Sequence, residues 1–382
     1  MTETKPNRIL PYPRSEVITG LEWLAPAAKY PGTGTDMHWH AWGADDALYF
    51  ADDDGANFGN PWNFAHLLKA TGDPPDFHLA ELHAFPQLGR PANDKYRRYV
   101  DGVLAVGSRL FVAAYDYNDD PETGKPFWFR DANSDHGGIV SLMYSDDGGE
   151  TFQNVPDPDA ETHYFLGPDF AGLSFVGFGP GYSGVPERFG DFVYAISNDV
   201  NWESGDHIRL ARVPKDRVLD RAAWEFYVGN ANGMTDSLPE WSADEATASP
   251  ILTDPGHVSH PTMTWNPGLG RFLLAFGSDE VPHTFDTPEE VVRTTWHRRR
   301  ELCLYEGPTP WGPWGLVHYD PFWEGEHVAY LPQIPPKWLS ADGREGWLVF
   351  SGDYGHYEGR GGKNFESFYA FMYRPFRLLT DR

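Results

Sequence analysis

The chain has 382 residues, and its 30 Lys and Arg against 56 Asp and Glu give a formal net charge of −26. Such an acidic chain lacks the basic face that nucleic acids and anionic membrane surfaces require, so neither is expected as a partner. No apolar run reaches the length of a membrane span, and one cysteine, Cys303, excludes an intrachain disulfide or a cysteine-based metal site.

Residues 1–32 are expected to form an N-terminal extension, and residues 33–380 a single domain. The first residues carry no apolar signal segment, which predicts a cytoplasmic location. Glycine (40), proline (33) and aromatic residues (15 Trp, 19 Tyr and 25 Phe) are abundant. This composition is typical of many short strands joined by turns, so the predicted fold class is all-β with only short helical insertions.

An apolar run that ends in small residues and an acid recurs five times, at intervals of about 60 to 80 residues. Each run follows a turn signal, and another apolar stretch precedes each turn. Five such strand–turn–strand units predict a five-bladed β-propeller, in which each four-stranded blade packs against its neighbours. The runs occupy residues 48–54, 110–116, 192–199, 272–279 and 347–353.

The segment 35–42, just before the first run, is dense in polar residues. Strand alternation would place Asp36, His38 and His40 on one face and the apolar residues between them on the other. The run that follows ends in three consecutive acids, 52–54. Three interpretations stay open. Asp36 and one of these acids form a carboxylate pair for glycoside hydrolysis, Asp36 and the histidines bind a divalent metal in the channel, or these groups satisfy one another around trapped water.

The innermost strands of a propeller line a central channel, so residues at equivalent positions converge at one opening. Counting 12 residues back from the start of a run gives Asp36 in the first unit, Arg98 in the second and His260 in the fourth. In the fifth unit, where the turn is longer, the equivalent residue is Tyr330. Asp101, three residues after Arg98, is either a third acid or a turn cap.

Two loops add candidate binding residues. Asp135 and His136 lie in a glycine-rich segment after the aromatic residues 127–129 and would form part of a groove wall. Asp353 opens a polar, aromatic loop that follows the fifth run. For all three residues, ordinary turn or surface chemistry is the alternative.

Two further motifs are structural. Residues 145–152 fit the pattern Ser-x-Asp-x-Gly-x-Thr-Phe, which resembles the Asp box of sialidase-type propellers, a turn between outer strands. Thr287, Pro288 and Glu290 form a capping-box pattern, which predicts a short helix leading into the basic run 298–300.

Several segments resemble a family of uncharacterised propeller proteins that includes glycoside hydrolase family 183, the endo-D-arabinanase-like enzymes. The resemblance spans about residues 33–380 and implies that the two acids fall on Asp36 and Asp54. Here His38 replaces a tryptophan of the family pattern, and His40 adds a second imidazole. The similar segments are 36–38, 42–49, 53–55, 99–111 and 209–226, while 304–314 is similar to an outer strand of family 43 propellers.

The leading hypothesis is therefore a carbohydrate-active hydrolase with its site at the channel mouth. Asp36 and Asp54 would be the carboxylate pair, with Asp101 as a third acid. The substrate would be a carbohydrate, no cofactor would be required, and no metal ligand is assigned. The expected substrate-binding residues are His38, His40, Arg98, Asp135, His136, His260, Tyr330 and Asp353.

Two other hypotheses stay open. A polysaccharide lyase on the same scaffold would use a histidine base, a tyrosine acid and Arg98 as the charge neutraliser. A non-catalytic propeller would bind a glycan or a protein without turnover.

Overall fold

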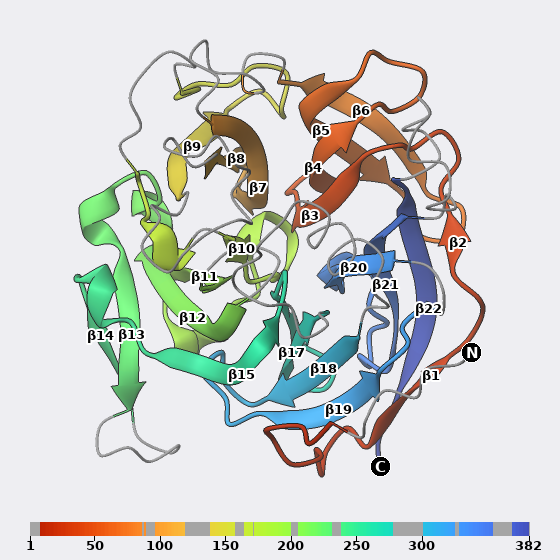
Figure 1. Cartoon of the computed structure of the whole chain (residues 1–382), viewed down its shortest axis with the longest axis vertical. Coiled ribbons are helices and arrows are strands. Elements are labelled where there is room, and N and C mark those ends of the chain that lie inside the picture. Colours follow the sequence, from red (N-terminus) through yellow and green to blue (C-terminus); the bar gives the residue numbers. More distant parts are fainter. Residues whose placement is uncertain are drawn as a thin grey trace, which may run out of the picture.

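The computed structural model shows five antiparallel sheets arranged around a central axis like the blades of a propeller (Figure 1). The predicted all-β, five-bladed fold is thereby confirmed. In the described part of the chain every helix is a short 3-10 turn, and none is long and apolar enough to cross a membrane. The described residues are 8–85, 88, 96–118, 138–156, 164–170, 172–199, 205–230, 238–277, 301–324, 328–353 and 369–381.

Blades 1 and 2 carry the acidic segments of the sequence. Successive strands pair as antiparallel neighbours from the inside of each blade outward. Blade 1 consists of β3 (Asp36–Trp42), β4 (Leu48–Gly55), β5 (Asn63–Thr71) and β6 (His78–Ala84), and blade 2 of β7 (Tyr96–Val106), β8 (Arg109–Asn118) and β9 (Ile139–Ser145).

Blades 3 and 4 continue the same order around the axis. In blade 3, β15 pairs with β12 beside the main strand order. Blade 3 consists of β10 (Ser174–Phe175), β11 (Phe192–Asn198), β12 (Gly205–Pro214), β13 (Glu225–Asn230), β14 (Pro239–Ser242) and β15 (Pro250–Val258), and blade 4 of β16 (Thr262–Asn266), β17 (Arg271–Phe276), β18 (Leu302–Gly307) and β19 (Gly315–Asp320).

Blade 5 is built from distant parts of the chain. Its inner strands are β20 (Val328–Gln333), β21 (Glu345–Asp353) and β22 (Phe371–Leu379). Two strands from the segment expected as an N-terminal extension, β1 (Gly20–Trp23) and β2 (Ala28–Lys29), both pair with β22. This segment therefore completes the last sheet and closes the ring of blades.

The innermost strands form a closed ring around the axis. Each of β3, β7, β10, β16 and β20 contacts the inner strand of the next blade. Asp36 begins β3, Arg98 lies near the start of β7, and Tyr330 lies in β20, while His260 precedes β16 by two residues. The residues obtained by counting back from the repeated runs thus lie on or directly before inner strands.

The core between blades 1 and 2 follows the alternation of β3. Met37, Trp39 and Ala41 are buried together with Val100 and Val103 of β7. A fully buried side chain of this kind contributes roughly 1.5–3 kcal/mol. These apolar contacts fix the position of β3 relative to β7 and hence the spacing of the polar residues at their ends.

Residues 145–152 form a hydrogen-bonded turn after β9. Asp147 Oδ1 accepts hydrogen bonds from Ser145 Oγ at 2.7 Å and from the Thr151 amide at 2.9 Å. The ring of Phe152 packs edge-on against Phe85, which follows β6, with centroids 4.9 Å apart. The turn thus holds the outer part of blade 2 against blade 1. The short helix expected near residues 287–300 lies outside the described residues.

Candidate functional site

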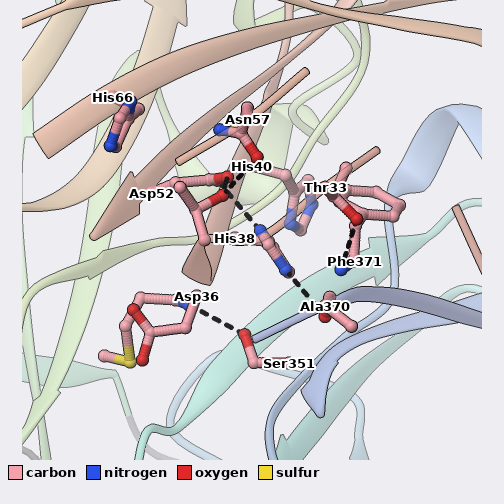
Figure 2. Close-up of polar contacts among 12 residues, drawn as sticks. Thr33, Asp36, His38, His40, Asp52, Asn57, His66, Ser351, Ala370 and Phe371 are labelled. Carbon is pink, nitrogen blue, oxygen red and sulfur yellow. Dashed lines mark hydrogen bonds and ion pairs between the residues drawn. The ribbon is translucent and has the colours of Figure 1, made fainter. Parts of the chain in front are cut away.

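The first site residue, Asp36, lies at the start of β3, directly opposite Asp53 of β4. A bulge follows at once, because the register of the two strands shifts by one residue between Asp36 and Trp39. Met37 in this bulge has φ 68°, and its amide donates to Ser351 Oγ of blade 5 at 2.8 Å (Figure 2).

The bulge changes which side chains share a face. Residues directly opposite in an antiparallel pair point to the same side, so Asp36 shares a face with Asp53. His38 instead faces Asp52, the preceding acid on β4, and its ring lies between Asp52 and Ala370 in Figure 2. The predicted common face of Asp36, His38 and His40 is therefore wrong, because the strand gains one residue at the bulge.

Tyr330 of the inner strand β20 connects three blades. Its hydroxyl donates to Asp36 Oδ2 at 2.7 Å, which links blade 5 to blade 1. Its ring lies 5.9 Å from the ring of His260, which stands before the inner strand of blade 4. His260 Nδ1 is 2.7 Å from Ser259 Oγ. An acid, a phenol and an imidazole thus lie together, as the register of the inner strands predicts.

Asp53 is the buried centre of the acidic group. Its Oδ1 accepts a hydrogen bond from the Val100 amide at 3.0 Å, and the Tyr115 hydroxyl lies 3.4 Å from Oδ2. Burial, together with the charges of Asp36 and Asp54, raises the pKa of Asp53 well above its usual value. The sequence analysis includes Asp53 only among the three acids 52–54 and selects Asp54. The strand pairing places Asp53, not Asp54, opposite Asp36.

Asp54 is the more accessible acid of the pair expected from the sequence. It is half-buried, whereas only 9% of Asp36 and 3% of Asp53 are exposed. Its φ is 22°, and the following Gly55 has φ 138°. A Cβ atom at Gly55 would lie 1.9 Å from the Gly34 carbonyl oxygen, so only glycine fits there. This turn directs the chain out of β4 at Asp54.

Asp101 and Arg98 are both buried in blade 2. The Leu173 amide donates to Asp101 Oδ2 at 2.6 Å and thereby ties the segment before β10 to β7. Burial raises the pKa of Asp101 well above its usual value, and the backbone amides of Leu173 and Gly102 oppose that rise. The exposed fraction of Arg98 is 2%. The described contact of Asp101 is one that holds the fold together.

His38 belongs to a buried network between blades 1 and 5 (Figure 2). Its Nδ1 lies 3.0 Å from Asp52 Oδ1, and its Nε2 donates to the Ala370 carbonyl at 3.2 Å. Asp52 Oδ2 accepts from the Thr35 hydroxyl at 2.6 Å, and that hydroxyl also lies 3.0 Å from Asn57 Oδ1. Both His38 and Asp52 are fully buried.

His40 is held by Gln333 of β20, a residue that sequence reasoning did not select. His40 Nδ1 donates to Gln333 Oε1 at 2.5 Å, and Gln333 Nε2 donates to the His38 carbonyl. Burial lowers the pKa of His40 to about 4, so its ring is neutral at pH 7. Because the bonded oxygen is an amide carbonyl, the proton of the neutral ring is on Nδ1.

Four of the nine non-glycine residues with positive φ in the described part of the chain lie around this site. Met37, Asp54, His260 and Leu331 all have positive φ, at 68°, 22°, 46° and 51°. Each is one of the polar residues described above or the immediate neighbour of one. A positive φ strains the backbone of a residue that has a Cβ atom. Residues strained in this way occur often at functional sites.

Three expected residues lie wholly or partly outside this description. Asp135 and His136 are outside the described residues, and Asp353 is described only as the last backbone position of β21. Within the described ranges, no group of three His, Cys, Asp or Glu side chains is arranged to hold a metal ion.

Comparison with solved structures gives the same fold. A "putative hydrolase" from Bacteroides ovatus is 12% identical, with a TM-score of 0.53 over 92% of this chain and 87% of that chain. An α-L-arabinofuranosidase from Podospora anserina, solved with cellotriose, is 8% identical, with a TM-score of 0.48 over 95% and 99%. A GH43_1 enzyme from Xanthomonas citri, solved with xylose, is 15% identical, with a TM-score of 0.45 over 92% and 90%.

No curated protein matches the chain. The family model of a domain of unknown function, DUF4185, matches residues 107–318, which is more than half of the 382 residues. The matched region begins in the β7–β8 turn of blade 2 and ends in the last strand of blade 4. The chain therefore belongs to the DUF4185 family.

Proposed function

We propose that the protein is a glycoside hydrolase that cleaves its substrate at the channel mouth with Asp36 and Asp54. One observation carries the proposal: the two carboxyl groups lie at the same end of the paired strands β3 and β4, and the charges of both raise the pKa of the buried Asp53. Paired carboxyl groups on either side of a bond are the usual machinery of glycoside hydrolysis.

The environment suggests a role for each acid. The Tyr330 hydroxyl donates to Asp36, and a hydrogen bond of this kind favours the charged carboxylate. Asp36 would therefore act as the base or nucleophile. Asp54 would donate its proton to the leaving oxygen as the carbon–oxygen bond breaks, and water supplies the new hydroxyl. His260, whose ring faces Tyr330, would orient substrate hydroxyls or hold Tyr330 in place.

The charge of the protein favours a neutral sugar. A chain with a formal net charge of −26 repels uronates, which are the substrates that a lyase requires. A lyase would also need Arg98 against the substrate, but only 2% of Arg98 is exposed. Hydrolysis is thus favoured over elimination. The resemblance to family 183 makes a D-arabinan the first substrate to test.

The test is mass spectrometry of the products formed from arabinans, xylans, uronate-containing polysaccharides and small glycosides. We expect products heavier than the parent fragments by one water. Asp36→Asn and Asp54→Asn should each reduce turnover by about 10²- to 10⁴-fold. Asp46→Asn, on the exposed turn of the same blade, is the matched control and should keep full activity.

Two results would contradict the proposal. Unsaturated products would indicate elimination and move the chemistry to His260 and Tyr330. Turnover that survives Asp36→Asn would remove the carboxylate pair from the mechanism, because an amide can neither take up a proton nor attack the sugar carbon.

A further inference from the structure

Phe58 and Trp62 are the most exposed aromatic residues of the described chain. Their side chains are 38% and 40% exposed, whereas the other Phe, Tyr and Trp side chains whose burial the structure describes are buried or half-buried. Both lie in the turn 56–62, which leaves β4 immediately after Asp54 and Gly55. Exposed aromatic rings carry a cost in water, so their confinement to one turn beside the carboxyl groups points to a ligand.

The turn lies at the same end of blade 1 as the proposed acids. In the pairing of β4 with β5, Gly55 is opposite Asn63. Trp62 is therefore adjacent in the chain to the residue that faces Gly55, which itself follows Asp54. A substrate held at Asp54 extends over this turn if it leaves the channel along blade 1.

The turn is rigid rather than loose. Asn57 is fully buried, and its Oδ1 accepts from the Gly34 amide at 3.2 Å and lies 3.0 Å from the Thr35 hydroxyl. Asn60 Nδ2 donates to Glu81 of β6 at 3.0 Å. The two exposed rings are thus presented from a fixed backbone, which reduces the entropy lost when a ligand binds.

Phe58 is held in a strained conformation. Its φ is 53°, an unusual value for a bulky side chain, and its amide donates to the Gly32 carbonyl at 2.6 Å. Its ring meets the ring of Tyr30 edge-on at 6.4 Å. A glycine would adopt this conformation without strain, so the aromatic ring stands here in spite of an unfavourable backbone conformation.

Trp62 is connected to the acidic centre by a series of rings. Its ring meets Phe64 edge-on at 4.3 Å, and Phe64 meets Tyr99 edge-on at 5.7 Å. Tyr99 stacks on Tyr115 at 5.7 Å, and the Tyr115 hydroxyl lies 3.4 Å from Asp53. These contacts fix the position of the Trp62 ring relative to the carboxyl groups.

We propose that Phe58 and Trp62 form an aromatic platform that binds a sugar ring next to the bond cleaved at Asp36 and Asp54. The proposal rests on the proposed function and names its substrate class: a neutral oligosaccharide or polysaccharide of at least three sugar units. The C–H face of a sugar ring is apolar, and it covers an aromatic face while its hydroxyls stay in water.

The experiment measures binding and turnover separately, with arabino-oligosaccharides and xylo-oligosaccharides of two to six units. Binding is measured by calorimetry on the Asp36→Asn protein, with and without Trp62→Ala or Phe58→Ala. Each alanine should weaken binding of the longer ligands about tenfold and leave the two-unit ligand unchanged. Trp62→Phe should restore most of the loss. Leu24→Ala, equally exposed at 40% between β1 and β2, is the matched control.

The outcomes separate this proposal from the proposed function. If no oligosaccharide is cleaved by the wild type but long ligands still lose affinity on Trp62→Ala, the platform stands and hydrolysis fails. If turnover is measured but kcat/KM and affinity are the same for Trp62→Ala and Leu24→Ala at every length, the platform is wrong. An affinity loss that is equal for two-unit and six-unit ligands would also overturn it.

Discussion

Asp53 is a carboxyl group withdrawn from water into a cluster of other acids. Its backbone and tyrosine contacts hold one orientation, and its exposed fraction is too small for it to touch a substrate. Its effect on the proposed chemistry is therefore indirect. When Asp53 carries a proton it adds no negative charge beside Asp36, which favours the charged carboxylate proposed for Asp36.

The raised pKa of Asp53 has a consequence for stability. In the unfolded chain this carboxyl loses its proton near its ordinary value of 3.8, whereas in the folded protein it keeps the proton to higher pH. The folded state then binds more protons, so the free energy of unfolding falls as the pH rises above that value. Asp53→Asn should remove this loss. In urea unfolding, the stability of the variant relative to wild type should increase with pH until the folded carboxyl ionises.

Asp46 provides a control of opposite sign. Lys337 lowers the pKa of this exposed carboxyl. The ionised carboxylate therefore stabilises the wild type at pH values above the ordinary pKa of aspartate, and this stabilisation is lost as the pH falls. The free energy of unfolding of Asp46→Asn should fall relative to that of the wild type as the pH rises.

If the unfolding free energies of Asp53→Asn and wild type differ by the same amount at every pH, the proton of Asp53 is not linked to folding.

At the scale of elements, the junction of blades 1 and 5 depends on the buried pair of His38 and Asp52. The pair lies between β3 and β4, and His38 also bonds the Ala370 carbonyl just before β22. Thr33 Oγ accepts from the next amide, that of Phe371, at 3.1 Å (Figure 2). Two strands far apart in the sequence are thus joined by polar groups inside an apolar junction.

Removing one partner of this pair should strongly lower the free energy of unfolding. His38→Ala leaves the Asp52 carboxyl buried without its imidazole partner, and the expected loss is about 3–5 kcal/mol of unfolding free energy. In a double-mutant cycle with Asp52→Ala, the losses should fail to add by about 0.5–3 kcal/mol. Urea unfolding of the four proteins measures this coupling. Strict additivity would show that the two side chains do not interact.

The positions of the site residues on the strands can be predicted from the sequence only in part. Counting back from the repeated runs locates Asp36, Arg98 and His260 on or directly before inner strands, because short turns join the first two strands of blades 1, 2 and 4. Strand alternation predicts the wrong face for Asp36, because the bulge at Met37 reverses it. The partner of His38 lies 332 residues away, at Ala370, and no local pattern predicts such a contact.

At the scale of the whole molecule, the closure of the ring depends on short strands. β1 and β2 have four and two residues, yet they join the sheet of β22. Strands this short are too short to show an alternation of polar and apolar residues. Side-chain packing determines that they pair with the edge of β22. Trp23 at the end of β1 shows this packing: the Arg374 guanidinium lies 4.3 Å from its ring, and His318 of blade 4 meets it edge-on at 6.0 Å.

Trp23→Ala tests this closure. It removes contacts to two blades at once and should lower the free energy of unfolding by about 2 kcal/mol, less than a fully buried tryptophan would. Val17→Ala, an exposed site on the same segment, should change it by less than about 0.5 kcal/mol. Denaturation followed by fluorescence and by circular dichroism provides the values. Equal effects of the two substitutions would mean that β1 adds nothing to closure.

The hydrogen bond from Tyr330 to Asp36 crosses the interface between the last blade and the first. The two residues are 294 positions apart in the sequence. The proposed site is therefore incomplete in a chain that is only partly synthesised or whose ring of blades is partly open. Activity becomes a read-out of ring assembly: a molecule that cleaves its substrate has joined its first and last blades. Heating or mild denaturant should for the same reason abolish turnover before the outer strands of the middle blades come apart.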